Sequence, residues 1–429
     1  MSTNLNNISN IVIINWNANG IKRNRNTFAA FLSYHNVDIA CISETHLCST
    51  DSIKFNGYSI YRNDRTAVRP SGGVALLIRT KIKHQQAYIP RLRSLEAVAI
   101  TLLINNINTT KVSAYQSPSY NMYTTDFDVI LSNYNKIVII GDLNSKHVNW
   151  KCNTTNVNWR KLYKYLSNSP AIISAPDKPT HYPYDPNKSP DILDVVLLKS
   201  TSLLINQEPL FELDSDHLPV KILIGASLIQ SEQTRKLING KPDWDKFKRY
   251  VTDNITIPKN ISNTLLADAA ISHLHETISY AAEQCTIPSK STLGQNYNSK
   301  ITPLIQKIIK NKHHIRKQWQ LHRRPEDRKK LNFLTKKVKL LLEEHRINSY
   351  QKYLSSIHPA DSNLWLATKR LIKPNDNKIP PLKSGNNFIN TVYEKCNLFA
   401  TTLENIFTLN DLNDSATINL MILSGKLYK

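Results

Sequence analysis

Short apolar, β-branched runs alternate with turns over the first half of the chain. Eight such runs predict β-strands, at residues 11–15, 38–43, 73–79, 97–104, 111–116, 137–142, 192–198 and 219–225. Between the first two, Phe28, Phe31 and Leu32 recur at helical spacing and predict a helix that crosses a sheet. The runs IVIIN and IVIIGD are apolar on both faces, as in strands that are covered on both sides. The pattern therefore predicts an α/β sandwich of large sheets flanked by helices.

From about Ala226 the pattern changes to long helical segments rich in Lys, Gln and Leu. Thr302 and Pro303 are typical of a helix cap and first residue, before an apolar face of Leu304, Ile305, Ile308 and Ile309. A second amphipathic helix is predicted by Leu331, Leu334, Val338, Leu341 and Leu342. Pro374 and the Pro380–Pro381 pair indicate a break, and residues 389–407 a further helix. We expect three regions: an α/β domain over 10–226, a basic helical region over 227–382, and a helical segment with a tail over 383–429.

The distribution of charge indicates which class of molecule the protein binds. The 429 residues include 55 Lys and Arg against 33 Asp and Glu, a formal charge of +22 that attracts polyanions. Residues 300–346 hold 15 basic and 4 acidic side chains, so this one stripe carries half of the excess. Nucleic acid is the expected partner, and Trp319 could then stack on a base. The alternative is that this stripe is a solvated helical face and that Trp319 lies in the core. The side chains expected to contact DNA are Lys312, Arg316, Lys317, Arg323, Arg324, Lys329 and Lys330.

Cysteine usage and the absence of targeting patterns favour an intracellular protein. The five cysteines form no CxxC pair and no Cys/His run, which argues against a zinc knuckle and a disulfide framework. The first residues, MSTNLNNISN, lack a basic segment followed by an apolar one. No stretch approaches the roughly 20 apolar residues of a membrane helix. A reducing compartment is therefore expected.

Polar side chains gather at the ends of the predicted strands, where α/β folds present their sites. They are Asn17, Asn19, Glu44, Tyr115, Asp142, Asn144, Asp214, Asp216 and His217. Oxygen ligands without cysteine suit Mg²⁺ or Mn²⁺. Carboxylates can hold such an ion and accept a proton from water, while Asn and His donate hydrogen bonds to phosphate oxygens. This inventory indicates hydrolysis of a phosphodiester.

The motifs NWNANG, ISETHL, AYQSPS, GDLNSKH, ILDVVLL and SDHLPV resemble, in order and spacing, those of the endonuclease/exonuclease/phosphatase superfamily, whose fold is DNase I-like. They cover residues 10 to 225, about half of the chain. NANGI, SETHL and GDLNSKH are similar more specifically to the endonuclease domain of jockey-type non-LTR retrotransposons of insects. The resemblance implies a nuclease that nicks double-stranded target DNA and leaves a 3′-hydroxyl to prime reverse transcription. It implies a nuclear location and element RNA as a further partner.

The resemblance also implies roles for individual residues. Glu44 would hold Mg²⁺ or Mn²⁺, with Asn17 and Asp216 close by. Asp142 would orient or deprotonate the attacking water, and Asn144 would align that water and contact the phosphate. His217 would bind the scissile phosphate, fixed in place by Asp194, and Tyr115 would stabilise the developing charge. Asn19 has either a site role or a turn role before Gly20, Thr180 is expected to be a loop hydroxyl, and the histidines expected to be structural are His35, His46, His147 and His181.

The helical half resembles the connector between the endonuclease and the reverse transcriptase of jockey-type elements, in HHIRKQWQLHRRPEDRKKLNFL and SNLWLATKRLIKP. The sequence contains no aromatic-x-Asp-Asp motif, so we expect a truncated element or gene fragment without a polymerase domain. Two alternatives stay open. The same scaffold serves abasic-site repair and the hydrolysis of inositol phosphates or sphingomyelin, and the chain could instead be an inactive remnant that binds nucleic acid.

Overall fold

The computed structural model describes part of the chain, with gaps at the termini and between the helical elements. The described residues are 10–67, 69–148, 152, 154–185, 187–201, 203, 205–228, 240–256, 262–288, 301–357, 365, 368, 382–384, 387–389 and 392–407. The expected break at Pro374 and Pro380–Pro381 lies outside these residues. None of the helices in the described part is long and apolar enough to cross a membrane.

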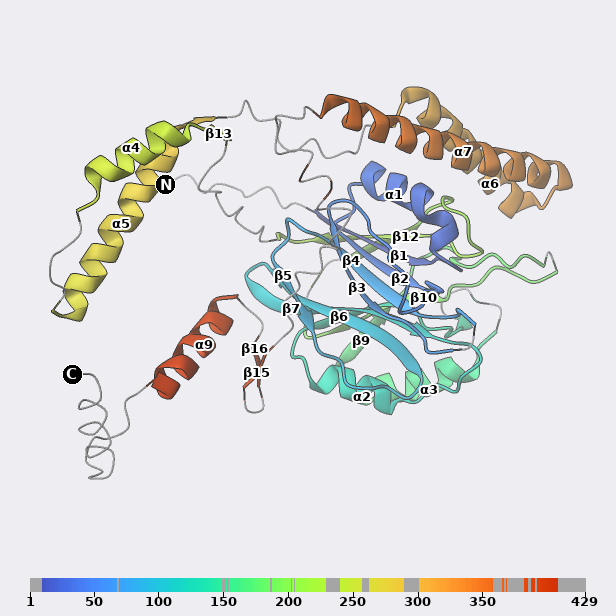
Figure 1. Ribbon diagram of the computed structural model, residues 1–429. Helices are drawn as coiled ribbons and strands as arrows, with labels where there is room; N and C mark the ends of the chain where they lie inside the picture. The colour runs from blue at the N-terminus through green and yellow to red at the C-terminus, as the bar shows by residue number, and fades with distance from the viewer. Residues whose placement is uncertain are drawn as a thin grey trace, which may run out of the picture.

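Two six-stranded sheets form the body of the molecule (Figure 1). The first has the order β11-β12-β1-β2-β4-β3, built from β1 (Asn10–Asn17), β2 (Ile39–Ser43), β3 (Tyr58–Asn63), β4 (Val74–Arg79), β11 (Ile205–Pro209) and β12 (Val220–Gly225). The second has the order β5-β6-β7-β8-β10-β9, built from β5 (His84–Ala87), β6 (Leu95–Ile104), β7 (Ile107–Gln116), β8 (Ile137–Asp142), β9 (Ala171–Ser174) and β10 (Asp194–Lys199). Each sheet contains one parallel pair, β1–β2 and β7–β8, among antiparallel neighbours.

Apolar side chains fill the sandwich in three layers. One core lies between the sheets and includes Ile13, Leu76 and Ile140. Helix α1 (Arg25–Tyr34), which follows the short η1 (Lys22–Asn24), buries Phe28, Phe31 and Leu32 on the outer face of the first sheet. Helices α2 (Thr125–Ser132) and α3 (Val157–Leu166) cover the outer face of the second sheet. The predicted α/β sandwich with flanking helices is confirmed.

The eight predicted strands correspond to β1, β2, β4, β6, β7, β8, β10 and β12. The structure adds β3, β5, β9 and β11, which the hydrophobic pattern does not predict. All four lie at the edges of the two sheets. An edge strand pairs on one side only, and sequences such as HQQA and INQEP therefore need no continuous apolar run.

Helices dominate the chain beyond the sandwich. Helices α4 (Trp244–Asn254) and α5 (Thr264–Gln284) contact each other beside the ribbon of β13 (Gly240–Pro242) and β14 (Thr286–Pro288). Helix α6 (Pro303–His322) begins after the predicted cap, since Thr302 Oγ1 accepts a hydrogen bond from Ile305 N at 3.4 Å. Helix α7 (Pro325–Ser356) follows at once, and a second ribbon of β15 (Leu382–Ser384) and β16 (Asn387–Ile389) precedes α9 (Val392–Phe407).

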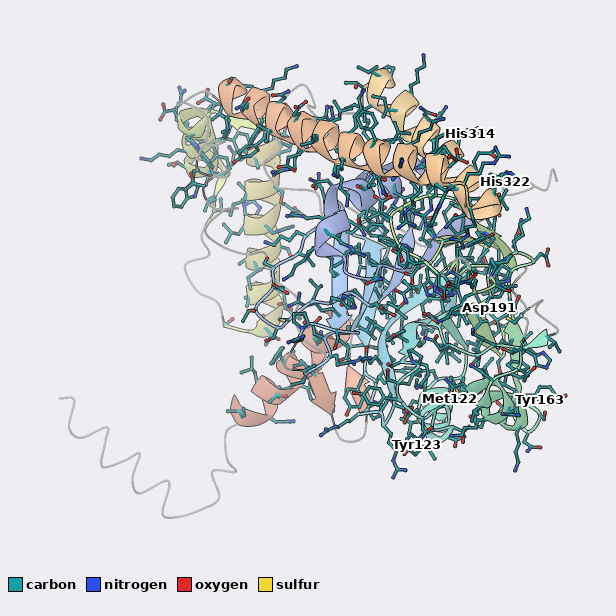
Figure 2. All side chains as sticks on the ribbon, turned by 90° about the vertical axis from the view of Figure 1, so that its right-hand side faces the viewer. Met122, Tyr123, Tyr163, Asp191, His314 and His322 are labelled. Atoms are coloured by element: carbon teal, nitrogen blue, oxygen red, sulfur yellow. The ribbon has the colours of Figure 1, made fainter. Side chains whose placement is uncertain are left out.

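Helices α6 and α7 form a hairpin that packs against α1 and hence against the first sheet. Figure 2 shows His314 and His322 of this hairpin at one end of the molecule, with Met122 and Tyr163 beside α2 and α3 at the other. Within α6 the buried side chains are Ile305, Lys312, Arg316 and Gln320. The face of α6 that meets the sandwich is therefore largely polar and cationic.

Candidate active site

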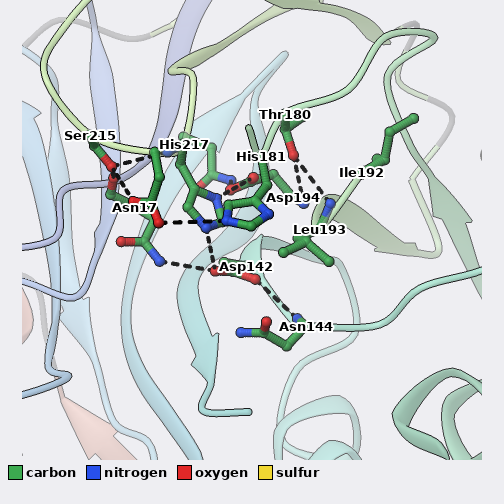
Figure 3. Close-up of polar contacts among 12 residues, drawn as sticks. Asn17, Asp142, Asn144, Thr180, His181, Ile192, Leu193, Asp194, Ser215 and His217 are labelled. Atoms are coloured by element: carbon green, nitrogen blue, oxygen red, sulfur yellow. Dashed lines mark hydrogen bonds and ion pairs between the residues drawn. The ribbon is translucent and has the colours of Figure 1, made fainter. Parts of the chain in front are cut away.

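Three buried ionisable side chains meet at one end of the sandwich (Figure 3). His217, which precedes β12, lies between the last residue of β8 and the first residue of β10: its Nδ1 is 3.1 Å from Asp194 Oδ2, and its Nε2 is 3.6 Å from Asp142 Oδ2. All three side chains are almost fully buried. The two strands pair so that Asp142 stands directly opposite Asp194. Two carboxylates from one sheet thus share one imidazole from the other.

This arrangement shifts the proton affinities of the cluster. Burial favours the neutral imidazole, but Asp142 and Asp194 outweigh it and raise the pKa of His217. Burial raises the pKa of Asp142, while the charge of His217 opposes that rise. His217 is therefore the cationic member of the cluster. Asp142 is a buried carboxylate with an enhanced capacity to accept a proton.

A second group of polar side chains surrounds Glu44, which directly follows β2. Asn17 Nδ2 donates to Glu44 Oε1 at 2.8 Å and to Asp142 Oδ2 at 3.0 Å, so it links the two groups. The hydroxyl of Tyr115 donates to Glu44 Oε1 at 2.8 Å. Burial alone would raise the pKa of Glu44, but hydrogen bonds from His46, Asn17 and Tyr115 lower it to about 2. Glu44 therefore stays ionised at neutral pH. Burial and the neighbouring charge of Glu44 raise the pKa of Tyr115, so its hydroxyl stays protonated.

Asp216 occupies the rim of the site. His181 Nε2 lies 3.5 Å from Asp216 Oδ2, and Asn19 Nδ2 donates to Asp216 Oδ1 at 3.5 Å. Burial acts to raise the pKa of Asp216, but His181 and His217 lower it overall, so this carboxylate is ionised as well. The rings of His181 and His217 lie 4.6 Å apart, between centroids. Asn19 therefore contacts the site in addition to preceding the turn at Gly20.

Asn144 and Thr180 make hydrogen bonds that hold the backbone around Asp142 and Asp194. Asn144 N donates to Asp142 Oδ1 at 3.0 Å, and Asn144 Nδ2 donates to Gln116 O at 2.9 Å. Thr180 is buried, and its hydroxyl accepts from Leu193 N at 3.1 Å and Asp194 N at 3.4 Å, as shown in Figure 3. Thr180 is thus the loop hydroxyl that the sequence predicts, with the added task of holding Asp194.

Left-handed backbone conformations concentrate around the site. Asn19, Glu44, His46 and Asn144 have φ angles of 42°, 48°, 50° and 46°, although none of them is glycine. Such conformations are costly for residues with a side chain and persist where surrounding contacts enforce them. They turn the chain immediately after β1, β2 and β8, and so direct the polar side chains across the end of the sandwich.

The donor set suits a hard divalent cation that takes part of its coordination from substrate. Glu44, Asn17 and Asp216 supply ionised carboxylates and an amide oxygen, and no thiol lies among them. Within the described part of the chain, no three Asp, Glu, His or Cys side chains converge closely enough to hold a metal ion by themselves. Mg²⁺ is commonly bound by one or two carboxylates together with water and phosphate oxygens. The ionised Glu44 fits that mode of binding.

His46 and His181, which were expected to be structural, lie at the site. His46 Nε2 is 3.5 Å from Glu44 Oε2, and His181 contacts Asp216. Asn15 was not singled out either, and its Nδ2 donates to Asp194 Oδ1 at 2.9 Å across the two sheets. His46 sits two residues after Glu44, so sequence proximity was an available signal. Asn15 is separated from Asp194 by 179 positions and gives no such signal.

The basic side chains that were expected to contact DNA fall into two groups, one buried and one exposed or partly exposed. Lys312 and Arg316 are buried: Lys312 Nζ lies 3.0 Å from Asp214 Oδ1, and the guanidinium of Arg316 donates to two backbone carbonyls. In this structure both cations contact the segment around Asp214, and their expected contact with DNA stays a prediction. Five others lie on the exposed or partly exposed surface of the hairpin, namely Lys317, Arg323, Arg324, Lys329 and Lys330.

Trp319 does not lie in a core, and its contact with a base stays a prediction. It is partly exposed, with the guanidinium carbons of Arg323 and Arg328 at 4.8 Å and 4.4 Å from its ring centroid. Arg328 also lies 5.7 Å from the ring of Tyr184, in the loop between β9 and β10. Cation–π contacts of this kind tie the turn of the hairpin to a loop beside the site.

Comparison with known proteins shows what the chain is similar to. A family model described as "Endonuclease-reverse transcriptase" matches residues 109–221. The chain is 28% identical over 411 residues to a probable RNA-directed DNA polymerase from transposon BS of Drosophila melanogaster, covering 92% of this chain and 44% of that protein. It is 24% identical over 403 residues to the RNA-directed DNA polymerase from mobile element jockey of Drosophila funebris, covering 91% and 43%. The chain thus spans less than half the length of these relatives.

Two solved structures show a lower similarity. The endonuclease domain of TRAS1, a telomere-specific non-LTR retrotransposon, matches with a TM-score of 0.41 and 17% identity, over 50% of this chain and 98% of that one. The catalytic domain of Xenopus laevis APE2 matches with a TM-score of 0.41 and 18% identity, over 52% of this chain and 94% of that one.

Proposed function

We propose, from the premise that the chain carries a DNase I-like endonuclease domain of the kind found in jockey-type non-LTR retrotransposon proteins, that it is a metal-dependent endonuclease. In this proposal it nicks one strand of double-stranded DNA and leaves a 3′-hydroxyl. That end would prime reverse transcription of an element RNA, in the nucleus.

The observation that carries the proposal is the placement of His217 between Asp142 and Asp194. The negative carboxylates keep the imidazole protonated, and a protonated imidazole can donate a hydrogen bond to a phosphate oxygen. Asp194 fixes the orientation of the ring through Nδ1, so Nε2 faces Asp142. A phosphodiester held at Nε2 would lie beside the buried carboxylate that is best able to accept a proton.

The remaining residues then take complementary roles. Asp142 orients or deprotonates the attacking water, since burial raises its pKa. Asn144, whose backbone N–H is bound to Asp142, aligns that water and contacts the phosphate. Tyr115 stays protonated and donates a hydrogen bond as negative charge develops on the phosphate oxygens. Asn17 connects Asp142 with Glu44 through one amide nitrogen and so keeps the two halves of the site at a fixed separation.

A Mg²⁺ or Mn²⁺ ion would be held by Glu44, with Asn17 and Asp216 nearby. When bound, it would supply charge neutralisation for the phosphodiester and for the departing alkoxide. Glu44 suits this task because its pKa of about 2 keeps it ionised without any cation present.

Basic surfaces beside the site support DNA as the substrate. A groove of about 350 Å³ between α1 and α7 is lined by Lys22, Arg23, Arg25, Lys339 and Arg346, together with the single acid Glu343. Lys22 and Arg23 of this groove belong to η1, which follows Asn19 by a few residues in the sequence. The exposed cations of the hairpin, Lys317, Arg323, Arg324, Lys329 and Lys330, would extend the contact along the phosphate backbone.

Nicking of supercoiled plasmid tests the proposal. Purified full chain with Mg²⁺ is expected to convert the plasmid to open circles, and EDTA or Glu44→Gln is expected to abolish the conversion. Asp177→Asn is the control, because Asp177 is an exposed carboxylate outside the site. Extension of the nicked product by a DNA polymerase would reveal the 3′-hydroxyl. An intact plasmid with folded wild-type protein, or equal cutting by Glu44→Gln, would reject the assignment.

The same protein separates the two alternatives. A duplex with an abasic site and a matched intact duplex distinguish repair from target nicking: a strong preference for the lesion would favour repair. Retention of DNA on a filter without any product, with and without Mg²⁺, would identify an inactive binding remnant.

A further inference from the structure

The segment that delivers His217 to the active site has an unusual backbone. Leu213 is buried and has a φ of 59°, a left-handed conformation that is costly for a bulky residue without compensating contacts. Three residues later the same segment supplies Asp216 and His217. A strained backbone this close to the reacting groups needs contacts that enforce its conformation.

Those contacts come from α6, about one hundred positions later in the sequence. Arg316 donates through Nη1 to Leu213 O, and through Nη2 to Ser215 O at 2.6 Å. Lys312, one helical turn earlier, pairs with Asp214 between these two carbonyls, at 3.0 Å. The two cations of α6 therefore hold every residue from Leu213 to Ser215, and both are at least 96% buried.

Hydrogen bonds connect this segment to the proposed catalytic groups. The hydroxyl of Ser215 accepts from His217 N at 3.1 Å and donates to Asn17 O at 2.7 Å. On the opposite side, Asn24 Nδ2 donates to Asp214 O at 3.2 Å. The segment is thus fixed between α6 and the loop that follows β1, and a shift at Ser215 would move both His217 and Asn17.

We propose that Arg316, assisted by Lys312, is a positioning residue of the nuclease, which holds the segment from Leu213 to His217 in its strained conformation so that His217 lies between Asp142 and Asp194. The helical hairpin α6–α7 is then a component of the active site, in addition to any contact it makes with DNA. This inference rests on the proposed nuclease function for its kinetic consequence, and on the geometry alone for its structural one.

The chemistry of the side chain makes the proposal specific to arginine. A guanidinium presents N–H donors in a rigid fork that can reach two carbonyls at once, whereas a lysine ammonium is a point charge on a flexible stem. Arg316→Lys keeps the charge and most of the buried volume but cannot bridge Leu213 O and Ser215 O together. The matched control is Arg249→Lys, at an exposed position on α4. Lys310→Met, exposed on α6, is the control for Lys312→Met.

The experiment measures two quantities on the full chain and its variants. The first is kcat and KM for nicking a defined duplex with Mg²⁺. The second, independent of activity, is hydrogen–deuterium exchange of the peptide that covers residues 213–218. Arg316→Lys is expected to lower kcat by about 100-fold, as small displacements of catalytic groups do, and to leave KM for DNA nearly unchanged. Exchange should rise in residues 213–218 and stay unchanged in the core strands.

Each outcome decides the inference. Unchanged kcat and unchanged exchange in Arg316→Lys would overturn it, as would a rise in KM alone, which would mean that Arg316 acts on DNA. Faster exchange across the whole sandwich would overturn it too, because Arg316 would then serve general stability. If the wild type cuts no DNA, the proposed function fails, and the exchange of residues 213–218 still decides whether α6 holds the segment.

Discussion

The cluster around His217 and the underside of α6 both bury charged side chains, but the excess of charge has the opposite sign in the two regions. At the cluster, Asp142 and Asp194 share the single cation His217, and Glu44 and Asp216 add further negative charge nearby. Under α6, Lys312 has Asp214 and Arg316 has two carbonyls. The first set keeps an excess of negative charge that a divalent cation can offset. The second set has two cations against one carboxylate, and Arg316 Nε and Asp214 Oδ2 have no hydrogen-bond partner among the described residues.

The largest effect is expected from disrupting the cluster around His217. His217→Ala and Asp194→Asn should each lower the rate of plasmid nicking by about 100-fold or more, because proton transfer and phosphate contact both depend on an oriented imidazole. If Asp194 acts through His217, the double variant should be no slower than His217→Ala alone. Single-turnover rates of the two single variants and the double variant test this coupling. Multiplicative losses would mean that the two residues act independently.

A smaller effect is expected from removing the contact between Lys312 of α6 and Asp214. Lys312→Met leaves the partly buried Asp214 with only the more distant Arg316, at 4.0 Å, as a cationic partner and should lower the free energy of unfolding by about 3 kcal/mol. Adding Asp214→Asn should restore part of that loss, because the uncompensated charge is then gone. Denaturant unfolding followed by circular dichroism measures both changes. Lys310→Met, on the solvent side of the same helix, should change stability by less than about 0.5 kcal/mol.

Lys111 extends the comparison to a buried cation with no partner. It lies in β7 within the core between the sheets, and its Nζ has no hydrogen-bond partner among the described residues. Burial lowers the pKa of Lys111 from 10.5 to about 7. Lys111→Met should therefore raise the free energy of unfolding, by about 2 kcal/mol at pH 7, because it removes an unsatisfied polar group.

The sign of the pH dependence follows from this lowered pKa. Between pH 7 and 10.5 the unfolded chain binds a proton at Lys111 that the folded chain does not. The wild type therefore loses stability as the pH falls through this window. The gain in Lys111→Met should be largest at pH 7 and below and should shrink at pH 9. Thermal melts of both proteins at pH 6, 7.5 and 9 measure it, and an equal gain at all three values would contradict the lowered pKa.

The smallest effects are expected on the exposed face of the hairpin. Arg324→Met and Lys329→Met should each weaken DNA binding only a few-fold and should reduce the slope of log affinity against log salt by about one. Fluorescence anisotropy with a labelled duplex across salt concentrations measures this slope. An unchanged slope in both variants would remove the exposed face of the hairpin from the DNA contact.

The sequence predicted the central part of the fold and missed its periphery. The runs IVIIN and IVIIGD identify β1 and β8 because these strands are covered on both faces. The edge strands β3, β5, β9 and β11 escape the same reasoning, since they pair on one side and accept polar residues such as those of HQQA. Edges are defined by what lies beside them in space, and the local pattern does not contain that information.

The site was predicted in the same uneven way. Asn17, Glu44 and Asp142 stand at strand ends that carry recognisable motifs, and the structure brings them together with His217 and Asp194. For Lys312 and Arg316 the charge count predicted a contact with DNA but could not tell that both lie on the buried face of the helix. Their partners lie near Asp214, a hundred positions earlier, and only the packing of α6 on the sandwich reveals them.

The strand order has a consequence for how the protein is made. The first strand, β1, lies between β2 and the last strand, β12, and pairs with β12 from Asn10–Gly225 to Asn15–Val220. During synthesis, β1 emerges first and must wait for more than two hundred residues before its second neighbour arrives. Contacts of such long sequence separation form late. A chain that stops before His217 would carry Glu44, Asp142 and Asp194 but neither His217 nor β12, so translation must pass Gly225 before the first sheet and the site are complete.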